Sequence, residues 1–112
     1  MPLTYQTQCR AMTAQLSGEI DHHAARSLMR ELDQAIESRS PRTLVLDMSG
    51  VSFMDSSGIA VLLRTLRRMQ ELGGTMEVIS VPPQAGKVLR SASVHKLIPL
   101  SFAGNEEKGA YL

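Results

Sequence analysis

Two adjacent serines, Ser56 and Ser57, stand within the stretch SFMDSSGI (residues 52–59). An apolar run typical of a buried strand precedes this stretch, and a run with helical periodicity follows it. A serine hydroxyl can act as a nucleophile, cap the free amides of a helix, or accept a phosphoryl group. These roles need different neighbours, so the residues around the pair distinguish them.

The neighbours of the pair do not match those of a catalytic serine. The turn reads Asp-Ser-Ser-Gly-Ile instead of glycine-x-serine-x-glycine, and His95 is the only histidine that follows it. The chain also lacks the Gly-x-x-x-x-Gly-Lys pattern of a phosphate-binding loop. A small serine hydrolase or nucleotide hydrolase stays open as an alternative, without a base or an orienting carboxylate in an established arrangement. We expect a protein that is not an enzyme.

A helical wheel separates the two serines. Asp55 or Ser56 can cap the first turn of the following helix. At 100° per residue, the apolar stripe of that helix lies opposite Ser57, which is therefore predicted to point to solvent. Ser56 lies nearer the edge of the buried stripe and is better placed for capping. The stripe consists of Ile59, Leu62, Leu63, Leu66 and Met69.

Four residues share the predicted outer face with Ser57: Ala60, Val61, Arg64 and Arg68. A small alanine beside an exposed valine, with a hydroxyl that capping does not need, predicts a docking patch. A phosphate on Ser57 would add about two negative charges at a helix start, where free amides favour an anion. A partner packed on the patch would then meet a hydrated dianion. The motif therefore predicts a binding switch.

Strands and helices alternate around this motif. Strands are predicted at residues 3–8, 12–16, 43–48, 75–81 and about 98–102. Helices are predicted from Asp21, a candidate N-cap, to about Ser40, after the motif to about Leu72, and at roughly 84–91. Pro41 and the Gly73-Gly74 pair would end the two long helices. Because the first two strands can form a hairpin, we expect an α/β fold with a mixed sheet of about four or five strands.

Composition limits the other possibilities. The 112 residues, 43% of them hydrophobic, suit a single domain over 1–112, and 12 basic against 11 acidic residues give no field that recruits nucleic acid or a membrane. Cys9 is the single cysteine and is expected in a half-buried strand position, while His22 and His23 diverge around their helix. We expect no metal and no cofactor. The absence of a signal segment or a long apolar run predicts a cytoplasmic protein, with a polar tail at 104–112.

Three segments carry a resemblance to a known family: GEIDHHAA (18–25), LVLD (44–47) and VSFMDSSGI (51–59). They resemble the anti-sigma factor antagonists of spore-forming bacteria, which belong to the STAS domain family, and among these the sporulation antagonists of anti-sigma F factors. The similarity covers nearly the whole chain apart from its tail. Ala60 departs from the family pattern, in which glycine is common, but alanine still permits close approach.

The resemblance implies a sheet with helices mainly on one side and a partner-switching mechanism. Ser57 would be phosphorylated by an anti-sigma factor that is a serine kinase. The unphosphorylated form would bind that factor with its nucleotide and release the sigma factor for transcription, and a PP2C-type phosphatase would restore it. Asp21 looks like the family's acidic contact near the phosphorylation site.

The partner-binding residues predicted from the wheel and the resemblance together are Asp21, Asp55, Ser56, Ser57, Ala60, Val61 and Arg64. Arg67 is expected to belong to a solvated face. The free protein is expected to be a monomer that does not bind nucleic acid or membrane. The alternative within the family is a STAS subunit of a stress-signalling assembly.

Overall fold

The computed structural model describes residues 3–8 and 10–103. The predictions for Cys9 and for the tail at 104–112 lie outside these residues. The strands are β1 (Leu3–Gln8), β2 (Ala11–Ile20), β3 (Thr43–Met54), β4 (Thr75–Val81) and β5 (Leu100–Phe102). The helices are α1 (His22–Arg39), α2 (Ser56–Glu71) and α3 (Pro83–Ser91), followed by a short 3-10 turn, η1 (Val94–Lys96).

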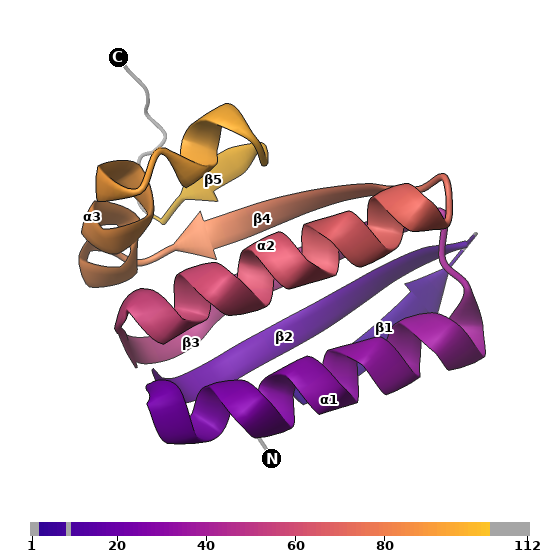
Figure 1. Ribbon diagram of the computed structural model, residues 1–112, viewed down its shortest axis with the longest axis horizontal. Helices are drawn as coiled ribbons and strands as arrows, with labels where there is room; N and C mark the ends of the chain where they lie inside the picture. Colours follow the sequence, from indigo (N-terminus) through magenta and orange to yellow (C-terminus); the bar gives the residue numbers. More distant parts are fainter. Residues whose placement is uncertain (1–2, 9, 104–112) are drawn as a thin grey trace.

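The strands form one sheet in the order β1-β2-β3-β4-β5. β1 pairs with β2 in the antiparallel sense, whereas β2 with β3, β3 with β4, and β4 with β5 form parallel pairs. The predicted hairpin and the mixed α/β sheet are therefore confirmed. α1 and α2 lie side by side in front of the sheet (Figure 1), as expected for helices packed mainly on one face.

The core lies between the sheet and the two long helices. Parallel register aligns Met12, Leu44 and Met76 in one row across three strands, and all three are buried. Ala14, Leu46 and Val78 form a second buried row. The alternate positions, such as Gln15 and Val45, are exposed or half-buried. The sheet thus has one helix-covered face and one open face, which is the period-2 pattern of a half-buried strand.

β3 continues six residues beyond its predicted end at Met48 and includes the first three residues of the SFMDSSGI stretch. The prediction ended at Met48 because the apolar run stops there, and along the rest of β3 the pairing with β2 shifts register after Gln15 and again after Gly18. Buried side chains then recur at every third residue: Met48, Val51 and Met54. Register shifts hide a strand from a period-2 search.

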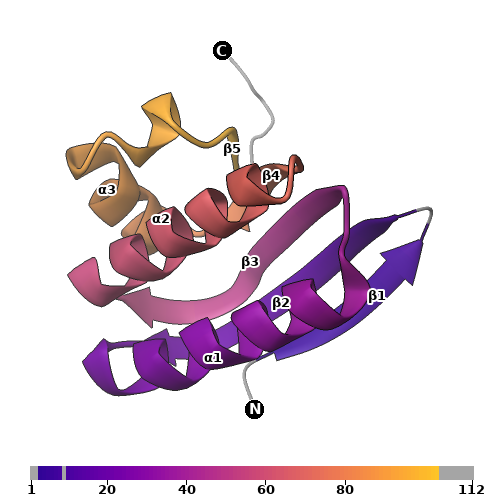
Figure 2. The ribbon, with the colours of Figure 1, turned by 45° about the vertical axis from the view of Figure 1, so that its right-hand side comes forward.

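The long helices end where the sequence predicted. α1 is capped by Asp21, and its C-cap is Ser40, next to Pro41. After α2, Gly73 has a φ of +74°, the left-handed conformation that glycine adopts readily. α1 and α2 both start at the edge of the sheet where β2 and β3 end, and they run in the same direction (Figure 2). Among the described residues, no helix is long and apolar enough to cross a membrane.

Candidate functional site

The starts of α1 and α2 are joined through the ends of two strands. The amide of Asp55 donates to the carbonyl oxygen of Ile20, with 3.2 Å between nitrogen and oxygen. Asp21 Oδ1 accepts from the amide of Ala24 at 2.9 Å, and Asp55 Oδ1 accepts from the amide of Ser57 at 2.8 Å. Both aspartates are therefore N-caps, and in α2 the cap is Asp55 and not Ser56.

Ser57 is half-buried and lines a surface hollow of about 290 Å³ between the two helix starts. Its other lining residues are His22, Ala25, Arg26, Met29 and Ala60. Ser57 was predicted to point to open solvent. The structure corrects this, because the residue lies in a recess opposite α1. The recess is open at the surface, so Ser57 is not sealed inside the molecule. Ser56, by contrast, is exposed.

The predicted exposure of Val61 is wrong, because its side chain is only 1% exposed and belongs to the core. The buried face of α2 consists of Gly58, Val61, Leu62, Thr65 and Met69. This face is rotated from the predicted stripe by about 100°, the angle of one residue. The apolar residues Ile59, Leu63 and Leu66 are only half-buried.

Gly58 and Thr65 explain the rotation, because a search for apolar side chains ignores both. A Cβ on Gly58 would lie 2.4 Å from Cγ and Sδ of Met54, so glycine allows α2 to start directly over the end of β3. Thr65 is 2% exposed, and its hydroxyl donates to the carbonyl oxygen of Val61 at 2.7 Å. A threonine that satisfies its own hydroxyl within the helix can replace an apolar residue in the core.

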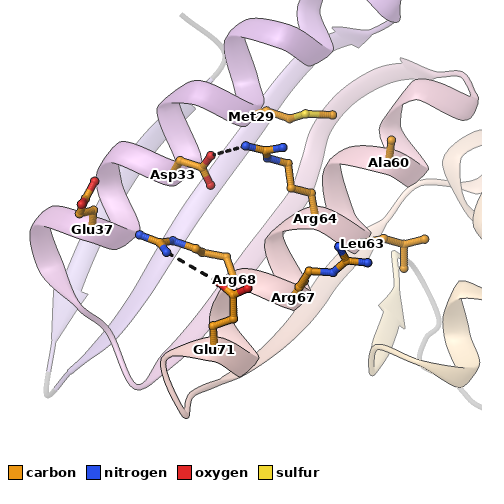
Figure 3. Close-up of a pocket in the computed structure, with 9 residues that line it drawn as sticks. All are labelled: Met29, Asp33, Glu37, Ala60, Leu63, Arg64, Arg67, Arg68 and Glu71. Atoms are coloured by element: carbon orange, nitrogen blue, oxygen red, sulfur yellow. Dashed lines mark hydrogen bonds and ion pairs between the residues drawn. The ribbon is translucent and has the colours of Figure 1, made fainter.

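A groove of about 680 Å³ runs along α1 and α2 and shares Met29 and Ala60 with the hollow around Ser57. Figure 3 shows Arg64 reaching from α2 to Asp33 on α1, where the ion pair measures 3.1 Å. Arg68 faces Glu71 on its own helix at 3.8 Å. Ala60 and Arg64 are exposed as predicted. Arg67 is exposed and lines the same groove.

The site lies within a sequence region that matches a known family. The model of the STAS domain family matches residues 3–107. The chain belongs to the STAS domain family. It is 34% identical over 89 residues to an anti-sigma F factor antagonist of Paenibacillus polymyxa, covering 80% of this chain and 76% of that protein.

Solved structures of similar proteins have the same fold as this STAS domain. The anti-sigma factor antagonist SpoIIAA in its unphosphorylated form superposes with a TM-score of 0.75 at 26% identity, over 94% of this chain and 90% of that one. An anti-sigma factor antagonist from Mycobacterium paratuberculosis gives a TM-score of 0.79 at 25% identity, over 88% and 83% of the two chains.

Two residues of this STAS domain that sequence reasoning did not single out shape the site. Gln84, at the start of α3, binds the end of β3 with both ends of its amide: Oε1 accepts from the amide of Met54 and Nε2 donates to its carbonyl oxygen, each at 2.8 Å. Phe53, the neighbouring residue, is 41% exposed. Its exposure follows from the three-residue burial period of β3, which a search for alternation does not detect.

The described residues of this STAS domain supply little for catalysis at Ser57. His22 lines the same hollow, but within residues 10–103 no hydrogen bond joins it to Ser57. The neighbouring carboxylate of Asp21 is engaged as a helix cap. Among these residues, no group of three or more potential metal ligands comes together. What the arrangement does offer is an accessible hydroxyl at a helix start.

Proposed function

We propose that this chain is an anti-sigma factor antagonist whose binding is switched off by phosphorylation of Ser57. The observation that carries the proposal is the position of Ser57, half-buried in an open hollow at the start of α2. Membership of the STAS family and similarity to proteins named anti-sigma F factor antagonists support it. These relatives favour the sporulation branch and a cytoplasmic protein that regulates transcription through a partner.

The modification is a phosphoryl transfer from ATP by the anti-sigma factor, acting as a serine kinase. Ser57 Oγ attacks the γ-phosphorus and loses its proton, a new O–P bond forms, and the bond from that phosphorus to the β,γ-bridging oxygen breaks to release ADP. The chain itself provides the acceptor and no catalytic group. A PP2C-type phosphatase reverses the state by hydrolysing the phosphoserine. The antagonist is thus a substrate, not an enzyme.

The partner-binding surface in this proposal surrounds the recess at the edge of the sheet. It consists of Asp21, Asp55, Ser56, Ser57, Ala60 and Arg64, with the exposed ring of Phe53 beside them. The buried Val61 is not part of it. In the unphosphorylated state, small side chains such as Ala60 let the anti-sigma factor and its nucleotide approach closely. The sigma factor is released when the anti-sigma factor binds this surface.

The off state follows from size and charge. A phosphoserine carries about −1.5 to −2 charges at neutral pH and strongly hydrated oxygens. A partner packed over the recess would have to strip that hydration and bury the charged group, which costs several kcal/mol in a buried interface. The fold itself tolerates the group, because the recess is open to water.

Incubation with the anti-sigma factor kinase and ATP, followed by mass spectrometry, tests the modification. We expect one phosphate on Ser57, none in Ser57→Ala, and one phosphate still on Ser57 in the control Ser56→Ala, which keeps the acceptor. Calorimetry on the two purified forms tests the switch: the unmodified protein binds the anti-sigma factor and the phosphorylated one binds much more weakly. Phosphate on another residue, or equal affinity of the two forms, would contradict the proposal.

A further inference from the structure

The wall of the recess that faces Ser57 is formed by α1 and contains two nitrogen-rich side chains. His22 and Arg26 are one turn apart on this helix, and both line the hollow with Ser57. Residues four apart lie on the same side of a helix. Both are exposed, so neither is fixed by burial. The first two turns of α1 therefore place an arginine and a histidine around the hollow that Ser57 lines.

Arg26 lines the hollow with Ser57, whereas Arg64, Arg67 and Arg68 line the neighbouring groove. Arg64 is already paired with Asp33. Among residues 3–4 and 10–103, whose side chains the structure describes, Arg26 has no hydrogen-bond or ion-pair partner. All of its guanidinium donors are available to a new acceptor, and a guanidinium matches phosphate oxygens in a two-pronged geometry.

We propose that Arg26, with His22 beside it, forms an internal binding site for the phosphoryl group of phosphorylated Ser57. This inference rests on the proposed function, since it concerns the modified state of the same serine. The hollow of about 290 Å³ holds the group easily, because a water molecule occupies only ~30 Å³ of liquid. Phosphorylation then joins α1 to α2 through an ion pair that the unmodified protein lacks.

Nearby carboxylates set the balance of charge at this site. Asp21 and Asp55 flank the recess, and each points one carboxylate oxygen at a helix amide. They repel a phosphate, so a cation on α1 is needed to offset them. Arg26 supplies this charge, and the imidazole of His22 can donate one hydrogen bond to a phosphate oxygen. The phosphorylated state is in this way stabilised within the antagonist itself.

The test uses protein synthesised with phosphoserine at position 57 by genetic encoding, so that no kinase is required. The second ionisation of the phosphate, normally near pH 6, is followed by phosphorus NMR at low salt. A neighbouring cation favours the dianion, so the titration midpoint of the wild-type chain lies low. Arg26→Gln removes the cation, and we expect the midpoint to rise by ~0.5 pH unit, as for a partly exposed ion pair.

Arg42→Gln is the matched control. Arg42 is exposed and precedes β3, so the same change of charge occurs at the opposite end of that strand from Ser57. Its midpoint should equal that of the wild-type chain. A His22→Gln background removes the imidazole's own titration, and the Arg26 difference should persist in it. Equal midpoints in Arg26→Gln and Arg42→Gln would overturn the site, as would a difference that survives 1 M salt unchanged.

The two proposals fail separately. If the titration midpoint of the phosphoserine does not depend on Arg26, the internal phosphate site is overturned. Phosphorylation by the kinase and its effect on binding are not affected by that outcome. Failure of the kinase to modify Ser57 would overturn the proposed function, while the titration of the encoded phosphoserine would still report the charge at Arg26. Thermal unfolding of the unphosphorylated variants, expected to match the wild-type chain, excludes a general loss of structure as the cause.

Discussion

Ala60 and Val61 are neighbours in α2 with opposite environments, one exposed and the other 1% exposed. Val61 packs in the core, so Val61→Ala should lower the free energy of unfolding by about 2 kcal/mol through lost burial and an unfilled cavity. Urea unfolding followed by circular dichroism measures this. Binding to the anti-sigma factor by the fraction that remains folded should be unchanged. A stability equal to wild type would show that Val61 is not a core residue.

Ala60→Glu should weaken binding to the anti-sigma factor and leave the stability of the fold nearly unchanged. The methyl group faces the recess and groove, so a longer charged side chain fits in the free protein but obstructs a partner. We expect the dissociation constant for the anti-sigma factor to rise about tenfold or more, with the unfolding free energy within ~0.5 kcal/mol of wild type. Calorimetry on the purified complex measures the first, and urea unfolding the second. Unchanged affinity would place Ala60 outside the interface.

Comparison of these two residues shows what the sequence can predict at this scale. The cap at Asp21 was predictable because capping depends only on residues within one turn, whereas at α2 the same reasoning left Asp55 and Ser56 open and favoured Ser56, which is not the cap. The orientation of α2 was not predictable, because Gly58 and Thr65 occupy positions in the buried face that hydrophobicity alone assigns to solvent. Their reasons are contacts with Met54 and with the helix's own backbone, which appear only when the chain is folded.

Among the elements, α3 does not line the recess but supports it through a contact with the end of β3. β4 pairs with β3 only as far as Asp47 and Ile79, so the last residues of β3 need other partners on that side. The side chain of Gln84 supplies them at Met54, immediately before the Asp55 cap. A side chain from a short helix thus replaces a missing strand and fixes the backbone that leads to Ser57.

Gln84→Ala should loosen this junction. Two hydrogen bonds to the main chain are lost, and we expect a fall in unfolding free energy of about 1–2 kcal/mol and faster hydrogen exchange of the Met54 amide. Lys87→Ala, an exposed position in the same helix, is the control and should change neither. Exchange resolved by NMR separates a local from a global effect. Unaltered protection of the Met54 amide in Gln84→Ala would contradict the role given to this glutamine.

The ion pair between Asp33 and Arg64 connects α1 to α2 at the surface. The arginine side chain is 61% exposed and the aspartate 33%, so solvent screens the pair. A double-mutant cycle with Asp33→Asn and Arg64→Gln should give a coupling energy of about 0.2–1 kcal/mol that disappears in high salt. Urea unfolding of the four proteins measures it. A larger, salt-independent coupling would mean that the pair is shielded from water.

At the scale of the whole molecule, the order of strands and helices was predictable because alternating periods and turn residues are local properties of the sequence. The register between strands was not predictable, so the length of β3 and the exposure of Phe53 were not predictable either. The pairing of α1 with α2 also lay beyond the sequence, since Arg26 and Ser57 are 31 positions apart. The hollow between them exists only because both helices start at the same edge of the sheet.

This arrangement confines the proposed interface to one edge and leaves the open face of the sheet uninvolved. Ser56→Lys and Gln15→Lys add the same charge at two exposed positions, one at the edge and one on the open face. We expect the edge variant to weaken anti-sigma factor binding about tenfold or more and the face variant to stay within about twofold. Both should remain folded, with at most ~1 kcal/mol lost where a lysine opposes the start of α2. Calorimetry gives the two affinities, and equal losses for both would mean that the partner covers the sheet face as well.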